Sequence, residues 1–388
     1  MSSPSLNEMA TPMKMAMVAG EASGDLLSSL LIHGLQKRWP DLSLVGIGGP
    51  KMDQLGFESW WPSHRLAVRG YIEVLKHYRE ITQIRSQLKV RLLHERPSVF
   101  IGVDAPDFNL DLSKALKKQG IPTVHFVCPS VWAWRAKRLE TLGQSTDHVL
   151  CLFPFEPALL AQHGIDATFV GHPIAQLVPK QIDKQAAKLR LGIDDQALVL
   201  AILPGSRLSE IQQLTSRFIQ AAAIFEKAHP ALTVLIPSAP GLMQHLKNMT
   251  DSLPKLQRLT ILEGQSHDAL ACADLALVAS GTATLEAALF KCPMVIAYSM
   301  PWISWEIIRR QRLQAWVGLP NILCGEFVVP ELLQSEATPT ALAAALQAWM
   351  DQPERVQDMR HKFTMMHDSL SQDTSLLATH AIEKILVS

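Results

Sequence analysis

Short apolar runs alternate along the chain with longer segments whose apolar residues recur at helical spacing. The runs are rich in branched aliphatic residues and end at turn-forming residues, which is typical of strands buried on both faces. Helical segments separate them, and this alternation indicates parallel α/β sheets. Strands are predicted at Met15–Ala19, Val99–Val103, Pro122–Val127, Val149–Phe153, Ala167–Val170, Ala197–Leu203, Leu232–Pro237, Leu259–Leu262, Leu275–Ala279 and Pro293–Ala297.

A polar, turn-rich stretch interrupts this alternation near the middle of the chain. It follows Gly171-His172-Pro173 and includes residues 179–184, so we place a linker at residues 172–184. A chain of 388 residues is also longer than one hydrophobic core usually serves. Two domains are therefore expected, at residues 14–171 and 185–388, preceded by a loose tail.

Residues 274–298 predict a strand, a tight turn, a helix and a second strand, and we expect an anion site at the turn. Ser280, Gly281 and Thr282 form this turn. The first N–H groups of the helix after it have no helical partner, and with the helix dipole they suit a phosphate or diphosphate. Glu286, about one helical turn further on, could accept hydrogen bonds from the hydroxyls of an attached sugar. An ordinary buried turn, with Glu286 on a solvated face, is the alternative.

A second anion site is predicted in the same domain, where Pro204-Gly205-Ser206-Arg207 ends the strand at Ala197–Leu203. Arg207 can bind phosphate oxygens through two N–H groups, and the Ser206 hydroxyl lies beside it. A surface arginine after a tight turn is the simpler interpretation. Two such turns in one sheet favour the interpretation as anion sites over that of a surface arginine.

In the first domain, Asp104 stands at the end of the predicted strand Val99–Val103. Open parallel sheets bind ligands at such ends, so Asp104 is a candidate general base. The alternative is a carboxylate that caps the following helix, a role for which Asp107 is better placed. The turn at Gly20–Asp25 lacks the Gly-Lys-Ser/Thr ending of a P-loop, and Gly46–Lys51 does not fit the dinucleotide fingerprint.

Residues 64–96 form a basic, apolar stretch with eight Lys or Arg against three Asp or Glu. Such a stretch can rest on an anionic membrane or bind a lipid that carries a phosphate. A long helix with a solvated basic face is the alternative. The residues expected to contact a lipid, acceptor or membrane are Leu66, Val68, Arg69, Ile72 and Lys76.

Composition limits the partners. The net charge is zero and the pI is about 7.2, so nucleic acid is not expected as a partner. Five cysteines show no metal-ligand spacing and indicate free thiols in a reducing, cytoplasmic compartment. The sequence shows neither a signal peptide nor an apolar run long enough to cross a membrane. No Asp-x-Asp pair occurs, and neither a metal nor a cofactor is expected.

Six motifs stand in order along the chain: Ala19–Asp25, Gly102–Asn109, Pro129–Trp134, Leu203–Arg207, Ser280–Glu286 and Leu319–Asn321. Together they resemble the lipid-A-disaccharide synthase family, over a span from about residue 14 to the C-terminus. One departure is Leu27-Ser28-Ser29, after Gly24-Asp25, where the family usually has small residues.

The resemblance implies a GT-B glycosyltransferase with two Rossmann-like parallel-sheet domains facing a cleft. It implies transfer from UDP-2,3-diacylglucosamine to 2,3-diacylglucosamine 1-phosphate (lipid X), with a β-1,6 bond formed and UDP released, in lipid A synthesis of Gram-negative bacteria. Ser206, Arg207, Glu286 and Asn321 would lie at the UDP site, and Asp104 would be the base candidate.

Family members are also described as peripheral proteins on the cytoplasmic face of the inner membrane, and as homodimers that exchange C-terminal parts. Two other functions stay open. One is a different UDP-sugar enzyme of the same architecture, such as an epimerase or a transferase with another acceptor. The other is a lipid-binding paralogue without catalysis, which the joint presence of Asp104, Arg207 and Glu286 disfavours.

Overall fold

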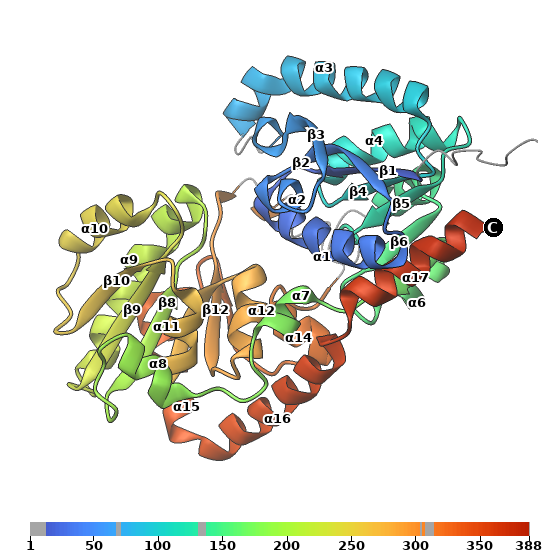
Figure 1. Cartoon of the computed structure of the whole chain (residues 1–388). Coiled ribbons are helices and arrows are strands. Elements are labelled where there is room, and N and C mark those ends of the chain that lie inside the picture. The colour runs from blue at the N-terminus through green and yellow to red at the C-terminus, as the bar shows by residue number, and fades with distance from the viewer. Residues whose placement is uncertain (1–12, 67–70, 131–136, 303–304, 307–313, 388) are drawn as a thin grey trace, which may run out of the picture. The chain divides into compact units, whose positions relative to one another are not determined.

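The computed structural model describes residues 13–66, 71–130, 137–302, 305–306 and 314–387 (Figure 1). The chain divides into two compact units. The first consists of residues 1–173 together with 372–388, and the second of residues 174–371. Each unit is built on its own parallel β-sheet.

The first sheet has seven strands in the order β3-β2-β1-β4-β5-β6-β7, and every neighbouring pair is parallel. Its strands are β1 (Lys14–Ala19), β2 (Ser43–Gly48), β3 (Glu58–Pro62), β4 (Val99–Val103), β5 (Thr123–Phe126), β6 (His148–Cys151) and β7 (Ala167–Phe169). Its helices are α1 (Ala22–Arg38), α2 (Pro50–Asp53), α3 (Tyr71–Glu95), α4 (Pro106–Lys117), α5 (Lys137–Ser145), α6 (Glu156–Ala161) and α17 (Thr374–Val387), with a 3-10 turn, η1 (Ser63–Arg65).

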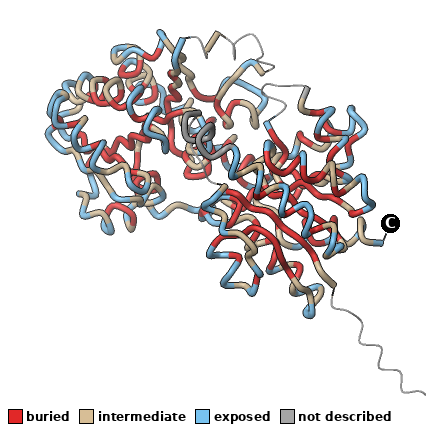
Figure 2. Tube along the Cα trace, turned by 90° about the horizontal axis from the view of Figure 1, so that it is seen from above, coloured by how far each residue is buried: buried red, intermediate tan, exposed pale blue. Residues whose placement is uncertain are grey.

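Alternate residues of the first sheet's strands enter different cores, as the pleat requires. Met15 and Met17 of β1 pack with residues of α1 and α17, whereas Ala16 and Val18 pack with residues of α3 and α4. Figure 2 shows the strand residues as mainly buried. The two faces of this sheet therefore have separate hydrophobic cores.

The C-terminal helix α17 belongs to the first unit, although the sequence pattern placed residues 372–388 in the second domain. Ala378, Ala381 and Ile382 are buried in the core shared with α1 and β1. An amphipathic helix packs wherever its apolar face finds a matching surface, and the pattern does not say which sheet provides it.

The second sheet has six parallel strands in the order β10-β9-β8-β11-β12-β13. They are β8 (Leu198–Leu203), β9 (Leu232–Ser238), β10 (Leu259–Glu263), β11 (Leu275–Ala279), β12 (Met294–Tyr298) and β13 (Glu331–Leu333). The helices are α7 (Pro173–Leu177), which begins at the boundary, α8 (Lys184–Arg190), α9 (Leu208–Glu226), α10 (Met243–Asp251), α11 (Ser266–Cys272), α12 (Thr282–Leu289), α14 (Leu319–Cys324), α15 (Pro339–Asp351) and α16 (Pro353–Leu370).

Most predicted strands are present to within a residue or two, and the expected parallel α/β architecture is confirmed. Three strands were missed, namely β2, β3 and β13. β2 contains two glycines, β3 is a half-buried edge strand, and β13 has only three residues. These features weaken the apolar signal on which a strand prediction depends.

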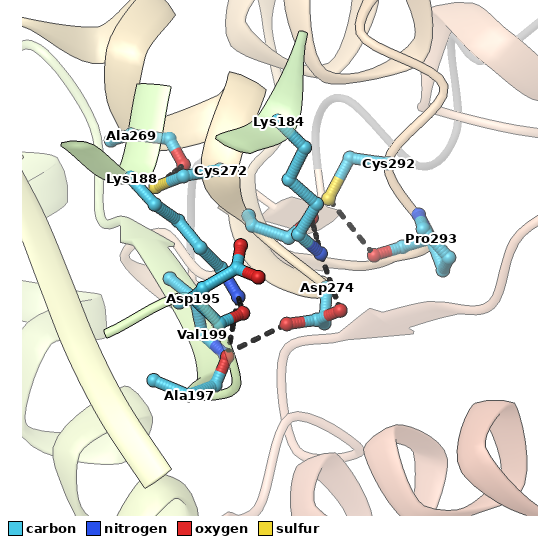
Figure 3. Close-up of polar contacts among 11 residues, drawn as sticks. Lys184, Lys188, Asp195, Ala197, Val199, Ala269, Cys272, Asp274, Cys292 and Pro293 are labelled. Atoms are coloured by element: carbon cyan, nitrogen blue, oxygen red, sulfur yellow. Dashed lines mark hydrogen bonds and ion pairs between the residues drawn. The ribbon is translucent and has the colours of Figure 1, made fainter. Parts of the chain in front are cut away.

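Polar contacts hold α8 against the amino edge of the second sheet, near the starts of β8 and β11 (Figure 3). Lys184 of α8 forms an ion pair with Asp274, whose carboxylate also accepts the Val199 N–H at 2.9 Å. Lys188, only 5% exposed, donates to the carbonyl oxygens of Ala197, at 2.9 Å, and Asp195. These contacts fasten α8 to the sheet and satisfy the charges.

Candidate functional site

In both sheets the order of the strands reverses at one place, and ligands of open α/β sheets bind at the carboxyl ends of the strands that meet there. In the first sheet these strands are β1 and β4, and in the second they are β8 and β11. The predicted base Asp104 directly follows β4. Of the two predicted anion turns, the one with Arg207 follows β8 and the one with Gly281 follows β11.

A pocket of about 530 Å³ lies at this place in the second sheet. Six of the predicted residues line it, from two different stretches of the chain: Ser206, Arg207, Ser280, Gly281, Thr282 and Glu286. The same pocket is lined by residues that sequence reasoning did not select, including Glu210, Ser238, Ser266 and Tyr298. Ser238 is the last residue of β9 and Tyr298 the last of β12. Their position at the carboxyl ends of predicted strands was the sequence signal that could have identified them as pocket residues.

The turn after β11 presents the start of α12 to the pocket. Gly281 has φ 142° and ψ −161°, a conformation essentially restricted to glycine. Among the described residues, no side chain caps α12 at this residue. The Ser280 hydroxyl donates to the Val317 carbonyl at 3.2 Å, which fixes the turn from outside the pocket. The Thr284 N–H already donates to the Gly281 carbonyl at 3.0 Å, so the N–H groups before it in α12 are the ones that suit an anion.

The turn after β8 is held by Glu210, in the first turn of α9. Its carboxylate accepts the N–H groups of Ser206 at 2.9 Å and Arg207 at 3.2 Å. Gly205 has φ 124°, and a Cβ there would lie 2.5 Å from the Cβ of Glu210. The Arg207 side chain is 72% exposed and 3.6 Å from Glu210. This turn therefore offers a guanidinium to an anion, while Glu210 occupies its N–H groups.

Glu286 is more buried than Arg207, with 21% of its side chain exposed. Burial raises the pKa of its carboxyl group, and His267, at 3.8 Å, partly offsets this shift. The His267 ring packs against Phe290, with ring centroids 5.2 Å apart. Tyr298 also has a raised pKa, chiefly because of burial and then because of Glu210. A half-buried carboxylate of this kind is a strong acceptor for hydroxyl groups.

Asn321, which the resemblance placed at the UDP site, is fully buried and does not line the pocket. Its oxygen accepts the N–H groups of Val328 and Val329, at 2.8 and 2.9 Å. Its nitrogen donates to the Val329 carbonyl at 2.9 Å and to Glu331 at 2.8 Å. Glu331 in turn accepts the Val317 N–H at 2.9 Å. Asn321 is thus linked to the Ser280 turn through Glu331 and the Val317 segment.

In the first unit, Asp104 is half-buried just beyond β4. Its pKa is raised mainly by burial, and Glu21 adds to the shift, while a hydrogen bond from the Ala105 backbone opposes it. Glu21 follows β1, the strand beside β4. The reversal of this sheet therefore carries a carboxylate with a raised pKa, which suits a general base.

Asp107 has a different environment from Asp104. Its side chain is 87% exposed and forms an ion pair with Arg138 at 2.6 Å. The expectation that it caps α4 is wrong, because the N-cap is Ala105 and has no side-chain hydrogen bond. The pairing with Arg138 could not be read from the sequence, since the two residues meet only when α4 and α5 pack together.

The predicted lipid-contact residues are only partly described. Leu66 is half-buried and packs against the core beneath α3 and α4. Gly20 lies between Leu66 and the Asp104 turn. A Cβ added at Gly20 would be 3.5 Å from the Cβ of Leu66 and 3.5 Å from the Cβ of Ala105. Leu66 is therefore close to the Asp104 turn. Val68 and Arg69 lie outside the described residues; Ile72 and Lys76 lie in the first part of α3, outside the part whose side chains are described.

Neither a metal centre nor a membrane span emerges from the described residues. In residues 13–66, 71–130, 137–302, 305–306 and 314–387, no group of three or more His, Cys, Asp or Glu side chains is arranged to hold a metal ion. In these same ranges no helix combines the length and apolarity needed to cross a bilayer.

Two Rossmann-like parallel sheets, the second with a pocket at its strand reversal, define the GT-B class of glycosyltransferases and related epimerases. The structure resembles UDP-GlcNAc 2-epimerase from Neisseria meningitidis, with a TM-score of 0.65 at 15% identity, over 97% of this chain and 100% of that one. It also resembles MurG from Acinetobacter baumannii, with a TM-score of 0.59 at 14% identity, over 96% of this chain and 100% of that one. These likenesses concern the fold.

The chain belongs to the lipid-A-disaccharide synthase family. The family model described as lipid-A-disaccharide synthetase matches residues 15–385. The lipid-A-disaccharide synthase of Albidiferax ferrireducens is 55% identical over 385 residues, which are 98% of this chain and 99% of the relative. That of Burkholderia thailandensis is 49% identical over 380 residues, 97% of this chain and 98% of the relative. The resemblance seen in the motifs is confirmed, and with it the glycosyltransferase class.

Proposed function

We propose that this chain joins UDP-2,3-diacylglucosamine to 2,3-diacylglucosamine 1-phosphate (lipid X) through a β-1,6 bond and releases UDP. Membership of the family supports this activity. The observation that carries it at the level of residues is the pocket at the β8/β11 reversal, because two separate turns and Glu286 converge there.

In this proposal the pocket holds the UDP part of the donor. The diphosphate lies at the start of α12, where the unpaired N–H groups and the helix dipole favour negative charge. Arg207 extends over it from the neighbouring turn, and Glu286 accepts hydrogen bonds from the ribose hydroxyls. The same groups stabilise the charge that develops on UDP as it leaves.

Asp104 is the proposed base. Its carboxylate takes the proton of the acceptor's 6-hydroxyl, and that oxygen then bonds to C1 of the donor sugar. The bond between C1 and the diphosphate oxygen breaks, and UDP leaves with the electron pair. Because the donor is α-linked and the product β-linked, the configuration at C1 inverts. The pKa of Asp104 is raised, so its carboxylate, when ionised, is a stronger base than that of an ordinary aspartate.

Asn321 contributes to the UDP site indirectly in this proposal. Its amide orients Glu331, which holds the Val317 segment against Ser280. It would therefore act on the shape of the diphosphate turn rather than on the nucleotide itself.

The membrane relationship is part of the proposal. Both substrates carry acyl chains, and the basic, apolar stretch at residues 64–96 would place the protein on the cytoplasmic face of the inner membrane. Flotation with vesicles containing anionic lipid tests this association. Arg65→Glu with Arg79→Glu should lower the fraction of protein bound to the vesicles, whereas equal binding would contradict the proposal.

A homodimer is also proposed, on the basis of the family resemblance. Light scattering of the purified chain tests it, and the mass of a monomer would contradict it.

The central experiment incubates purified full-length protein with both substrates in mixed micelles and quantifies disaccharide and UDP. Asp104→Asn should lower kcat by about 10²–10⁴-fold, with the UDP dissociation constant unchanged by calorimetry. Asp107→Asn is the control, because that carboxylate is exposed and paired with Arg138. Full turnover in Asp104→Asn, together with loss in Asp107→Asn, would transfer the role of base to Asp107.

A further inference from the structure

The turn that carries Asp104 has an unusual backbone. Asp104 has φ 49° and Ala105 has φ 42°, so two consecutive residues other than glycine lie in the left-handed region. L-residues avoid this region because Cβ approaches the backbone too closely. Such a conformation persists only where surrounding contacts impose it, and it is often found at functional sites.

Contacts from two sides impose it here. The Asp104 N–H donates to the Phe126 carbonyl of β5 at 2.9 Å. Its carbonyl accepts a hydrogen bond from the Asn109 side-chain nitrogen at 2.8 Å. The backbone N–H groups of Phe108 and Asn109 both donate to the Ala105 carbonyl at 3.0 Å. The two peptide planes that set the direction of the Asp104 side chain are thus fixed.

Asn109 also links this turn to the strand reversal itself. Its side-chain nitrogen lies 3.3 Å from the Val103 carbonyl at the end of β4 and 3.5 Å from the Val18 carbonyl of β1. The residue is fully buried. A Cβ on Gly102 would lie 2.9 Å from its Cβ, so α4 approaches β4 closely because residue 102 is glycine. One amide therefore joins β1, β4 and the Asp104 turn.

We propose that Asn109 is a positioning residue that sets the orientation of the Asp104 carboxylate toward the acceptor hydroxyl. This inference rests on the proposed function, in which Asp104 is the base. Asn109 is neutral and lies beneath the turn, so it acts on direction and burial rather than on charge. Proton transfer needs near-ideal geometry, and a displacement of about 1 Å at a reacting group can cost about 10²-fold in rate.

The charged groups around the turn do not supply this orientation. Glu21, after β1, repels the Asp104 carboxylate. Asp107 on α4 is engaged with Arg138. His125, on the neighbouring strand β5, is fully buried, and its pKa is lowered to about 4, so it is neutral at physiological pH. Losing the Asn109 amide therefore leaves the local charges unchanged.

The test compares Asn109→Ala and Asn109→Ser with Ser113→Ala in the disaccharide assay. Ser113 lies one turn further along α4, is also fully buried, and its hydroxyl has no hydrogen-bond partner among the described residues, which makes it a matched control. Both Asn109 variants should lower kcat about 10–100-fold, with KM for each substrate changed less than about twofold and UDP affinity unchanged. Ser113→Ala should retain kcat.

The pH profile separates positioning from a general loss of structure. A released Asp104 turn exposes the carboxylate to water, so its pKa falls toward the ordinary value and the acid limb of kcat moves to lower pH. Adding Ala105→Gly to Asn109→Ala gives a second check. Glycine adopts this backbone without strain, so thermal stability should recover while kcat stays low.

Two results would overturn the inference. One is wild-type kcat in both Asn109 variants while Asp104→Asn is inactive. The other is recovery of kcat together with stability in the Asn109→Ala/Ala105→Gly variant, which would show a purely structural role. Normal turnover in Asp104→Asn is a different failure, because it removes the proposed base itself and with it the reason to position it.

Discussion

The two edges of the second sheet contain the same kinds of side chain in opposite situations. At the amino edge, Lys184 and Asp274 are paired, and Lys188 is buried against backbone carbonyls (Figure 3). At the carboxyl edge, Arg207 is largely exposed and Glu286 borders a pocket. Charges that are satisfied inside the fold stabilise it, whereas charges that face a cavity are available to a ligand.

The direction of the chain explains this division. In a parallel sheet with right-handed crossovers, the helix after each strand starts at the carboxyl edge, so unpaired N–H groups gather there. The amino edge receives the ends of helices and the loops that return to the sheet. These loops can be closed by side chains such as Lys188 without blocking a ligand site.

The largest effect is expected from breaking the amino edge. Lys188→Met keeps the apolar stem but leaves the carbonyl oxygens of Ala197 and Asp195 without their donor. Of the two, only the Ala197 carbonyl is buried, and a buried group left unpaired costs about 1–3 kcal/mol. A domain of this size loses about 2–4 °C of melting temperature per kcal/mol, so calorimetry should show a fall of about 2–12 °C.

If the amino edge serves stability alone, Lys188→Met should still bind UDP with normal affinity at temperatures well below its melting temperature. Lys180→Met is the matched control, because Lys180 forms an exposed pair with Asp368 that contributes little. A weakened UDP affinity in Lys188→Met, or an equal loss of stability in Lys180→Met, would contradict the division between the edges.

The next largest effect is expected at the carboxyl edge. Arg207→Ala should raise the UDP dissociation constant about 10–100-fold, because a hydrogen bond to a charged group contributes about 1.5–3 kcal/mol. Its melting temperature should stay close to wild type, since the Arg207 side chain is largely exposed and its pair with Glu210 is long, at 3.6 Å. Titration calorimetry and thermal unfolding measure the two quantities on the same preparation.

Two variants sharpen this result. Arg258→Ala removes another exposed arginine, next to the amino end of β10, and should leave UDP affinity unchanged. Asn321→Ala should raise the dissociation constant less than Arg207→Ala and lower stability more, because its amide makes buried hydrogen bonds. A larger effect of Asn321→Ala on UDP, with stability retained, would place its amide at the nucleotide.

The smallest effect concerns pH. The pKa of Glu286 is raised, so the ionised form is lost at a higher pH than for an ordinary glutamate as the pH falls. UDP affinity should therefore be greatest where the carboxyl group is ionised, and it should decline about 2–10-fold, the range of one ordinary hydrogen bond, as the pH falls and the group becomes protonated. Glu286→Gln retains an acceptor oxygen and should lack this component.

Titration of the phosphates is common to both proteins, so the difference between wild type and Glu286→Gln isolates the carboxylate. Identical pH profiles in the two proteins would show that Glu286 does not contact the nucleotide. His267→Asn provides a further contrast. It removes the neighbour that opposes the shift, so the decline in UDP affinity should begin at a higher pH.

Residues at the ends of predicted strands were the most informative part of the sequence. Gly281 and Ser206 follow apolar runs that do form strands, and the turns do line one pocket. Glu210 was overlooked although it stands three residues after Arg207, where an acidic side chain often closes the first turn of a helix. The family resemblance placed Asn321 at the UDP site, whereas in the structure it does not line the pocket. A motif marks a residue of the family but does not say which atoms that residue contacts.

By itself, the sequence determined the alternation of strand and helix, the family, and the residue types at the strand ends, because these depend on local periodicity and short motifs. The tertiary structure decided which strands are neighbours, and hence that β1 meets β4 and β8 meets β11. It also decided that α17 joins the first unit and that Asn109 holds the Asp104 turn. These contacts join residues far apart in the chain or depend on backbone conformation, and neither follows from a pattern of apolar and polar positions.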